Sequence, residues 1–202
     1  MRVVLLTGPS GAGKSVLAAR SGLPTVCLDD FYRDGDAPDL PRHGSGRIDW
    51  DHPDAWDADR ALSVLETLAT SGHAELPIYD ISRDRRVGSH HLDVRGAPVV
   101  IAEGIFAAEL IGPCRQRGLL ADALCLADGR TRTFWRRLRR DLREARKAPM
   151  TLLRRGWQLR DGEPALLHRH AALGAEVVDG DAALERLRAL ATDLPPARND
   201  AA

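Results

Sequence analysis

Short apolar runs recur along the chain, and most of them are followed by glycine or by acidic residues. Runs of four to eight apolar residues bounded by turn signals are typical of strands buried on both faces, as in a parallel sheet. Alternation of such strands with helices predicts an α/β fold with a five-stranded, mainly parallel sheet flanked by helices. The expected strands are Val3–Thr7, Pro24–Leu28, Pro98–Ala102, Ala123–Ala127 and Ala175–Val178.

Stretches with helical periodicity lie between these runs. The second of them carries Leu62, Leu65 and Leu68 on one face, and Asp54 or Asp57 is expected to cap it. A later one places Phe134, Leu138, Leu142 and Ala145 on one stripe, with arginines elsewhere. The expected helices are Lys14–Arg20, about Asp54–Thr70, about Arg132–Lys147, one within residues 150–172, and Ala182–Leu190.

The middle of the chain predicts a loop and a hairpin. Residues 33–53 are rich in Asp, Gly, Pro and Arg, and a loop of that length in a compact domain is usually functional. Leu76–Ile81 is expected to form a hairpin with a return strand that carries His90 and His91, which as neighbours cannot share a face to bind a metal. Residues 1–194 are expected to form a single domain, and residues 195–202 a disordered tail.

The first predicted strand and helix are joined by a glycine-rich stretch of the form G-x-x-x-x-G-K-[ST], the phosphate-binding P-loop. Its glycines let successive N–H groups point at an anion, and the helix N-terminus and a lysine add positive charge. We therefore expect ATP or GTP as ligand, with Mg²⁺ bound by the Ser15 hydroxyl. A glycine turn that only packs a helix on a sheet is the weaker alternative. The expected nucleotide-binding residues are Gly8, Ser10, Gly11, Ala12, Gly13, Lys14, Ser15 and Val16.

Acidic residues follow two of the predicted strands. Asp29 and Asp30 come after the second, and Glu103 comes after the third. Because the carboxyl ends of parallel strands line the ligand crevice, these side chains should face the P-loop. Asp29 is a candidate general base or Mg²⁺ ligand, and Glu103 occupies the Walker-B position of a Mg²⁺ ligand. A carboxylate that merely ends a strand is the alternative for Glu103.

Charge and composition narrow the class of protein. The 202 residues carry no net charge, but residues 29–59 hold ten acids against three arginines, and residues 130–170 hold thirteen Arg or Lys against four acids. A neutral whole argues against nucleic-acid binding, and the apolar runs are too short to cross a membrane. We expect a cytoplasmic protein with a small-molecule substrate, and a homo-oligomer remains open. The scattered Cys27, Cys114 and Cys125 are expected to be buried thiols.

Five stretches together resemble the uridine kinase branch of the phosphoribulokinase/uridine kinase family, and an arginine-rich stretch resembles the lid of that family. The likeness covers about residues 1–147 in the right order, and the D-H-P-D-A stretch is the part that points to a nucleoside. The five stretches are Gly8–Ser15, Asp29–Tyr32, Asp51–Ala55, Pro77–Asp80 and Glu103–Ile105, and the lid stretch is Arg136–Asp141.

The resemblance implies a P-loop kinase that phosphorylates the 5′-hydroxyl of a nucleoside with ATP and Mg²⁺. Asp29 would take the hydroxyl proton, while Asp51 and Arg137 would hold the ribose 2′- and 3′-hydroxyls. Tyr79 would lie at the base. The lid, about residues 130–150, would close over the phosphates with Arg137 and Arg140. Because phosphoryl transfer has a loose transition state, Lys14, Mg²⁺ and the lid arginines would contribute most of the rate.

The chain departs from the family where the base would bind. The position of the family's base-contacting histidine holds Asp84, and the aromatic residue after Tyr-Asp is Ile81. An ionised Asp84 only accepts hydrogen bonds, so it would favour the amine of cytosine. Alternatively, Asp84 pairs with Arg83 or Arg85, and Trp50 and Tyr79 form an unselective slot.

Two other functions remain open. One is a kinase of the same fold for another hydroxylated metabolite. The other is a regulatory module that binds a nucleoside triphosphate without an acceptor, against which Asp29 and Asp51 argue.

Overall fold

The computed structural model of the chain describes residues 1–127 and 164–193. Its centre is a five-stranded sheet in the order β2-β5-β1-β6-β7, and every neighbouring pair is parallel. This confirms the predicted α/β P-loop fold. The strands are β1 (Arg2–Thr7), β2 (Thr25–Cys27), β5 (Val99–Glu103), β6 (Leu120–Leu126) and β7 (Glu176–Val178).

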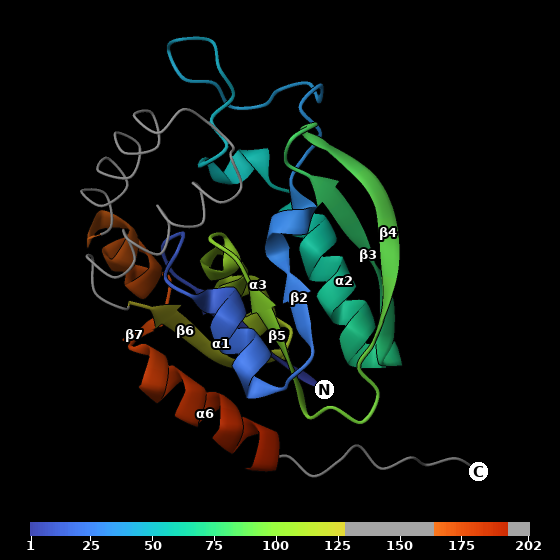
Figure 1. Ribbon diagram of the computed structural model, residues 1–202, viewed down its shortest axis with the longest axis vertical. Coiled ribbons are helices and arrows are strands. Elements are labelled where there is room, and N and C mark those ends of the chain that lie inside the picture. The colour runs from blue at the N-terminus through green and yellow to red at the C-terminus, as the bar shows by residue number, and fades with distance from the viewer. Residues whose placement is uncertain (128–163, 194–202) are drawn as a thin grey trace.

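Helices cover both faces of the sheet because side chains alternate along each strand. Val4 and Leu6 of β1 pack with α1 (Lys14–Ser21) and α6 (Gly180–Asp193), which Figure 1 shows on the near side of the sheet. Val3 and Leu5 face the larger core on the other side. That core includes residues of α2 (Ala58–Ser71), the short 3-10 helix η3 (Ala107–Leu110) and α3 (Ile111–Gln116).

The predicted hairpin is present as β3 (His73–Asp80) and β4 (Arg85–Asp93), an antiparallel pair separate from the main sheet. In Figure 1 it lies along α2, and Ala74 and Leu76 of β3 belong to the large core. Most of β4 is exposed. β3 packs on the segment that follows β2. The hairpin thus flanks the sheet at the carboxyl ends of its strands.

The second helix begins four residues later than predicted. Asp57 is its N-cap and accepts a hydrogen bond from the Arg60 amide at 3.1 Å, whereas Asp54 lies in a separate 3-10 turn, η2 (Pro53–Ala55). The reason is Trp56, which is extended and buried and donates its indole N–H to the Leu28 carbonyl at 2.7 Å. Burial of this side chain interrupts the helix before Ala58.

The boundaries of other strands and helices also differ from the predicted ones. β2 ends at Cys27, and the 3-10 helix η1 (Leu28–Phe31) follows, so Asp29 lies just beyond the strand on η1. The helix predicted within residues 150–172 is described over residues 164–172.

Cys114 and Cys125 are buried as expected, but Cys27 is exposed, which corrects that prediction. The short β2 is one of the two edge strands of the sheet, so no strand covers the outer side of its last residue, Cys27.

Several predictions fall outside the described residues: the arginine-rich lid of about residues 130–150, with its helix over Arg132–Lys147, and the tail over residues 195–202. Within residues 1–127 and 164–193, no helix combines the length and the apolar content needed to cross a bilayer.

Candidate functional site

The P-loop connects β1 to α1 at the carboxyl edge of the sheet. Gly8, Gly11 and Gly13 adopt positive φ angles of 138°, 82° and 98°, a conformation that favours glycine. A Cβ built on Gly8 would lie 2.6 Å from the Leu126 carbonyl oxygen, so β6 also leaves no room for a side chain there. The loop therefore has the backbone conformation that the glycine pattern predicts for an anion-binding turn.

Lys14 is folded back over this loop. Its side chain is only 8% exposed, and Nζ donates to the carbonyl oxygens of Gly8 at 3.0 Å and Pro9 at 3.3 Å. These contacts hold the ammonium group within the turn that would surround a phosphate. Val16, predicted to contact the nucleotide, lies on the first turn of α1 and is 64% exposed.

Ser15 and Glu103 meet beside Lys14. The Ser15 hydroxyl donates to Glu103 Oε1 at 2.7 Å, although the two residues come from different elements, α1 and β5. Glu103 is 6% exposed, whereas Ser15 is exposed. A hydroxyl next to a carboxylate suits Mg²⁺, which proteins commonly hold through one or two such oxygens together with nucleotide phosphates and water. No group of three or more His, Cys, Asp or Glu ligands for a metal occurs in the described part of the chain.

Asp29 lies on η1, and its carboxylate is next to Gly104, which directly follows β5. A Cβ on Gly104 would lie 3.1 Å from Asp29 Oδ1 and 2.9 Å from Leu28 Cβ, so glycine lets this carboxylate approach the end of β5 closely. Desolvation raises the pKa of Asp29, and the charges of Glu103 and Asp30 raise it further, while Lys14 opposes them. A carboxylate with a raised pKa is suited to accept a proton.

The same cluster of carboxylates affects Cys27. Although Cys27 is exposed as a residue, desolvation and the charges of Asp29, Asp30 and Glu103 raise the pKa of its thiol. The thiol is therefore protonated at neutral pH.

An aromatic cluster lies next to Asp29 and Asp30. The Tyr32 ring contacts Trp50, Tyr79 and Phe106, with centroid distances of 5.6, 5.8 and 5.9 Å. The Asp30 carboxylate accepts the Tyr79 amide hydrogen bond at 3.2 Å and so joins η1 to β3. The structure thus brings the predicted Trp50 and Tyr79 together around Tyr32.

Asp51 follows Trp50 in the long loop and is exposed. Its backbone amide donates to Asp49 Oδ1 at 3.1 Å, and the Tyr32 hydroxyl donates to the Trp50 carbonyl at 3.2 Å. Both groups belong to the peptide unit between Trp50 and Asp51, and the two contacts hold this unit in place beside Tyr32. Asp51 therefore lies at the border of the aromatic cluster.

Asp84 lies at the tip of the hairpin in the left-handed region, with a φ of 48°. Its carbonyl accepts the Gly35 amide hydrogen bond at 2.6 Å, which ties the tip to the long loop. Desolvation raises the pKa of Tyr79 to about 12, and the charges of Asp84 and Asp34 act in the same direction, while that of Arg86 opposes them. Arg83 forms its ion pair with Asp80 at 3.5 Å.

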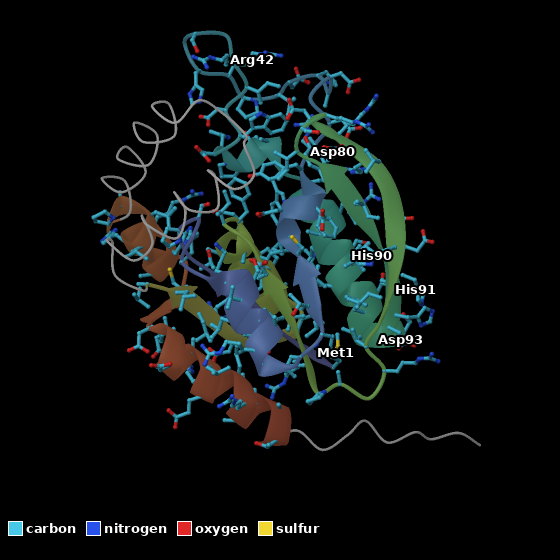
Figure 2. The ribbon with its side chains drawn as sticks, in the orientation of Figure 1. Met1, Arg42, Asp80, His90, His91 and Asp93 are labelled. Atoms are coloured by element: carbon cyan, nitrogen blue, oxygen red, sulfur yellow. The ribbon has the colours of Figure 1, made fainter. Side chains whose placement is uncertain are left out.

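The last part of β4 lies away from this site. Figure 2 shows His90, His91 and Asp93 along β4, the strand of the hairpin farther from the P-loop, while Asp80 lies near the upper end of the hairpin. Arg137 and Arg140, the predicted lid residues, are outside the described residues.

Three residues near the site were not predicted from the sequence. Arg86 pairs with Asp57 at 3.3 Å, and its amide donates to Asp34 at 2.8 Å, so it braces the hairpin against the long loop. Thr7 and the buried His170 are 3.1 Å apart below the P-loop. The position of Thr7 before the first P-loop glycine was a usable signal, whereas nothing in the sequence marked His170.

Comparison with known proteins agrees with this geometry. The model of the phosphoribulokinase/uridine kinase family matches residues 3–144. The uridine kinase of Deinococcus deserti is 29% identical over 158 residues, which cover 75% of this chain and 73% of that protein. The inorganic pyrophosphatase TTM2 of Arabidopsis thaliana is 33% identical over 158 residues, but these cover only 21% of it. The uridine kinase of Chlamydia pneumoniae is 29% identical, and the chain spans about half of its length.

Two solved structures share the fold. A candidate fructose transport system kinase from Silicibacter superimposes with a TM-score of 0.57 and 20% identity, covering 88% of this chain and 86% of that one. A candidate uridine kinase from Bacillus stearothermophilus gives a TM-score of 0.53 and 18% identity, with 88% of each chain covered. With a family model that matches most of its length and a P-loop site of the expected geometry, the chain belongs to the phosphoribulokinase/uridine kinase family.

Proposed function

We propose that this protein transfers the γ-phosphoryl group of ATP to the 5′-hydroxyl of a pyrimidine nucleoside. The observation that carries the proposal is the meeting of three groups at one edge of the sheet: Lys14 in the P-loop, the Ser15–Glu103 pair and the desolvated Asp29. Phosphoryl transfer needs a cation at the phosphates, oxygen ligands for a metal and a group that receives the hydroxyl proton. Each of the three supplies one of these needs.

In the proposed reaction, the 5′-oxygen of the nucleoside attacks the γ-phosphorus and forms the new P–O bond. The bond between the γ-phosphorus and the β,γ-bridging oxygen breaks, and ADP leaves with that electron pair. The hydroxyl proton passes to a carboxylate oxygen of Asp29, whose raised pKa favours its acceptance. Mg²⁺, held by Ser15 and Glu103, would neutralise charge on the phosphate oxygens. Lys14 orients the β- and γ-phosphates.

The proposed acceptor site is the aromatic cluster around Tyr32. Trp50 and Tyr79 offer flat surfaces for a base, and Asp51 at its border is a suitable acceptor for two ribose hydroxyls. In this proposal Arg137 assists Asp51, and Arg140 joins Arg137 at the phosphates. Asp84, at the tip of the hairpin, would prefer the exocyclic amine of cytosine to the O4 oxygen of uracil.

A second candidate function is phosphorylation of another small hydroxylated metabolite by the same machinery. Asp84 and Ile81 favour it, because they replace the family's histidine and aromatic residue at the base. This alternative changes the acceptor but leaves Asp29, Lys14 and Glu103 in the same roles.

The test is a coupled ADP-release assay with ATP over a panel of nucleosides, deoxynucleosides and sugars. The matched controls are Lys14→Ala, which should abolish turnover, and Thr25→Val, a change at the opposite end of β2 that should not. Turnover highest with cytidine or uridine supports the proposal. Turnover only with sugars supports the second candidate, and ATP binding without acceptor-dependent ADP release contradicts both.

A further inference from the structure

A buried histidine lies beneath the P-loop and has no role in the reaction described above. His170 lies on the helical segment of residues 164–172 and is only 2% exposed. Its Nδ1 is 3.1 Å from Thr7 Oγ1 and 3.8 Å from Cys125 Sγ. Desolvation and the charges of Arg169 and Lys14 lower the pKa of His170 to about 4, so the ring is neutral at physiological pH.

The Thr7 hydroxyl contacts both His170 and Ile105. Its oxygen is 3.1 Å from His170 Nδ1 and 3.3 Å from the Ile105 carbonyl oxygen. Because the hydroxyl has a single proton, it can donate to Ile105 and still hydrogen-bond to His170 only when Nδ1 carries the proton of the neutral ring. The Nδ1–H tautomer is therefore the one that joins all three groups.

Ile105 links this pair to Asp29. The Ile105 carbonyl accepts a hydrogen bond from Thr7. Gly104, the residue before Ile105, lies against the Asp29 carboxylate, since a Cβ on Gly104 would be 3.1 Å from Asp29 Oδ1. Contacts therefore run from His170 through Thr7 to the Gly104–Ile105 backbone, which packs against Asp29.

The helix that carries His170 is firmly attached at this place. Arg169 pairs with Glu109 of η3 at 2.6 Å, and Leu167 packs against the large core. The His170 carbonyl accepts the Ala175 amide hydrogen bond at 3.0 Å, which closes the turn leading to β7. Movement of His170 would therefore require the whole segment to shift.

We propose that His170 and Thr7 are positioning residues for Asp29, which they orient through the Ile105 backbone. The proposal rests on the role of Asp29 in the proposed function. Neither side chain needs to touch a substrate. Their effect should appear in the rate of phosphoryl transfer and not in the binding of either substrate, because a small displacement of a reacting group lowers the rate by as much as about 100-fold.

The kinetic test uses substitutions that remove or keep single hydrogen bonds. Thr7→Val removes the hydroxyl at constant shape, Thr7→Ser restores it, and His170→Phe and His170→Asn form the equivalent pair. We expect Thr7→Val and His170→Phe to lower kcat by about 10- to 100-fold, with acceptor KM and the Kd for ATP within about two-fold. Thr7→Ser and His170→Asn should recover most of kcat. The matched control is Thr25→Val, which removes a hydroxyl bound to the Leu23 carbonyl, away from the site.

Equal kcat in Thr7→Val and wild type, or no recovery in Thr7→Ser, would overturn the proposal. A second measurement does not depend on the acceptor. Long-range ¹H–¹⁵N correlation spectra should show His170 protonated at Nδ1, and the Ile105 amide resonance should shift in Thr7→Val but not in Thr25→Val. A proton on Nε2 or an unmoved Ile105 resonance would refute the proposed contacts, even if no acceptor in the panel is phosphorylated. Failure to phosphorylate any acceptor would by itself contradict only the proposed function.

Discussion

Replacement of Asp29 by asparagine should separate activity from stability, because the two respond with opposite sign. Asparagine keeps the shape of the side chain and retains one acceptor oxygen. It loses the ability to take a proton. The expected loss is therefore that of a general base alone, about 10²- to 10⁴-fold in kcat, or about 2.7 to 5.4 kcal/mol of transition-state stabilisation. Acceptor KM should change little.

The stability of the folded protein should rise in the same variant. The pKa of Asp29 is raised in the folded state by desolvation, so its ionised form is less stable there than in the unfolded chain. This penalty is absent below the ordinary carboxyl pKa of about 3.9, grows as pH rises toward the folded pKa, and is constant above it. The neutral asparagine side chain carries no such penalty, so Asp29→Asn should melt at a higher temperature at pH 7, and the difference should shrink toward pH 4.

The assay combines steady-state kinetics with thermal melts between pH 4 and 8, without nucleotide or Mg²⁺ in the melts. Asp59→Asn, an exposed change in the first turn of α2, is the control for loss of a charge: it should leave kcat unchanged, and it should not raise the melting temperature, because an acid at a helix N-terminus is stabilising. A variant Asp29→Asn that retained more than about a tenth of the wild-type kcat would exclude Asp29 as the general base. A lower melting temperature at pH 7 would contradict the effect of desolvation.

Three further changes test other parts of the site. Asp51→Asn should raise acceptor KM and erase discrimination against deoxyribose analogues in steady-state assays, and a kinetic profile like that of Asp29→Asn would refute its separate role. Asp84→His should change the cytidine-to-uridine ratio of kcat/KM by about ten-fold or more, so an unchanged ratio would remove Asp84 from the base site. Asp57→Ala should lose the cap of α2 and the Arg86 pair, costing about 1 to 2 kcal/mol of unfolding free energy by urea titration, whereas unchanged stability would show that neither contact matters.

The sequence predicted the sheet and the P-loop well because their signals are local. Buried parallel strands are continuous apolar runs, and the glycine spacing prescribes the backbone of the turn. Glu103 could be placed beside Ser15 for a similar reason, since the carboxyl ends of parallel strands meet at one edge. Ser15 and Glu103 therefore meet although they are 88 residues apart in the sequence.

Contacts that depend on tertiary packing could not be predicted in this way. The start of α2 depends on the Trp56 indole reaching the Leu28 carbonyl, which no propensity at positions 54–57 encodes. The exposure of Cys27 depends on its strand being at the edge of the sheet. His170 had no sequence signal, because a lone histidine on a helix becomes informative only when its neighbours Thr7 and Cys125 are known.

The central claim is that the protein makes a nucleoside 5′-monophosphate, and ³¹P NMR of the reaction tests it most directly. The wild-type protein is incubated with ATP, Mg²⁺ and cytidine, and Lys14→Ala serves as the inactive control. The account predicts loss of the ATP γ-phosphate signal and growth of a new phosphomonoester triplet, coupled to the two 5′ protons, in equal amount to the ADP formed. ADP with inorganic phosphate and no phosphomonoester, or an equal reaction in Lys14→Ala, would contradict it.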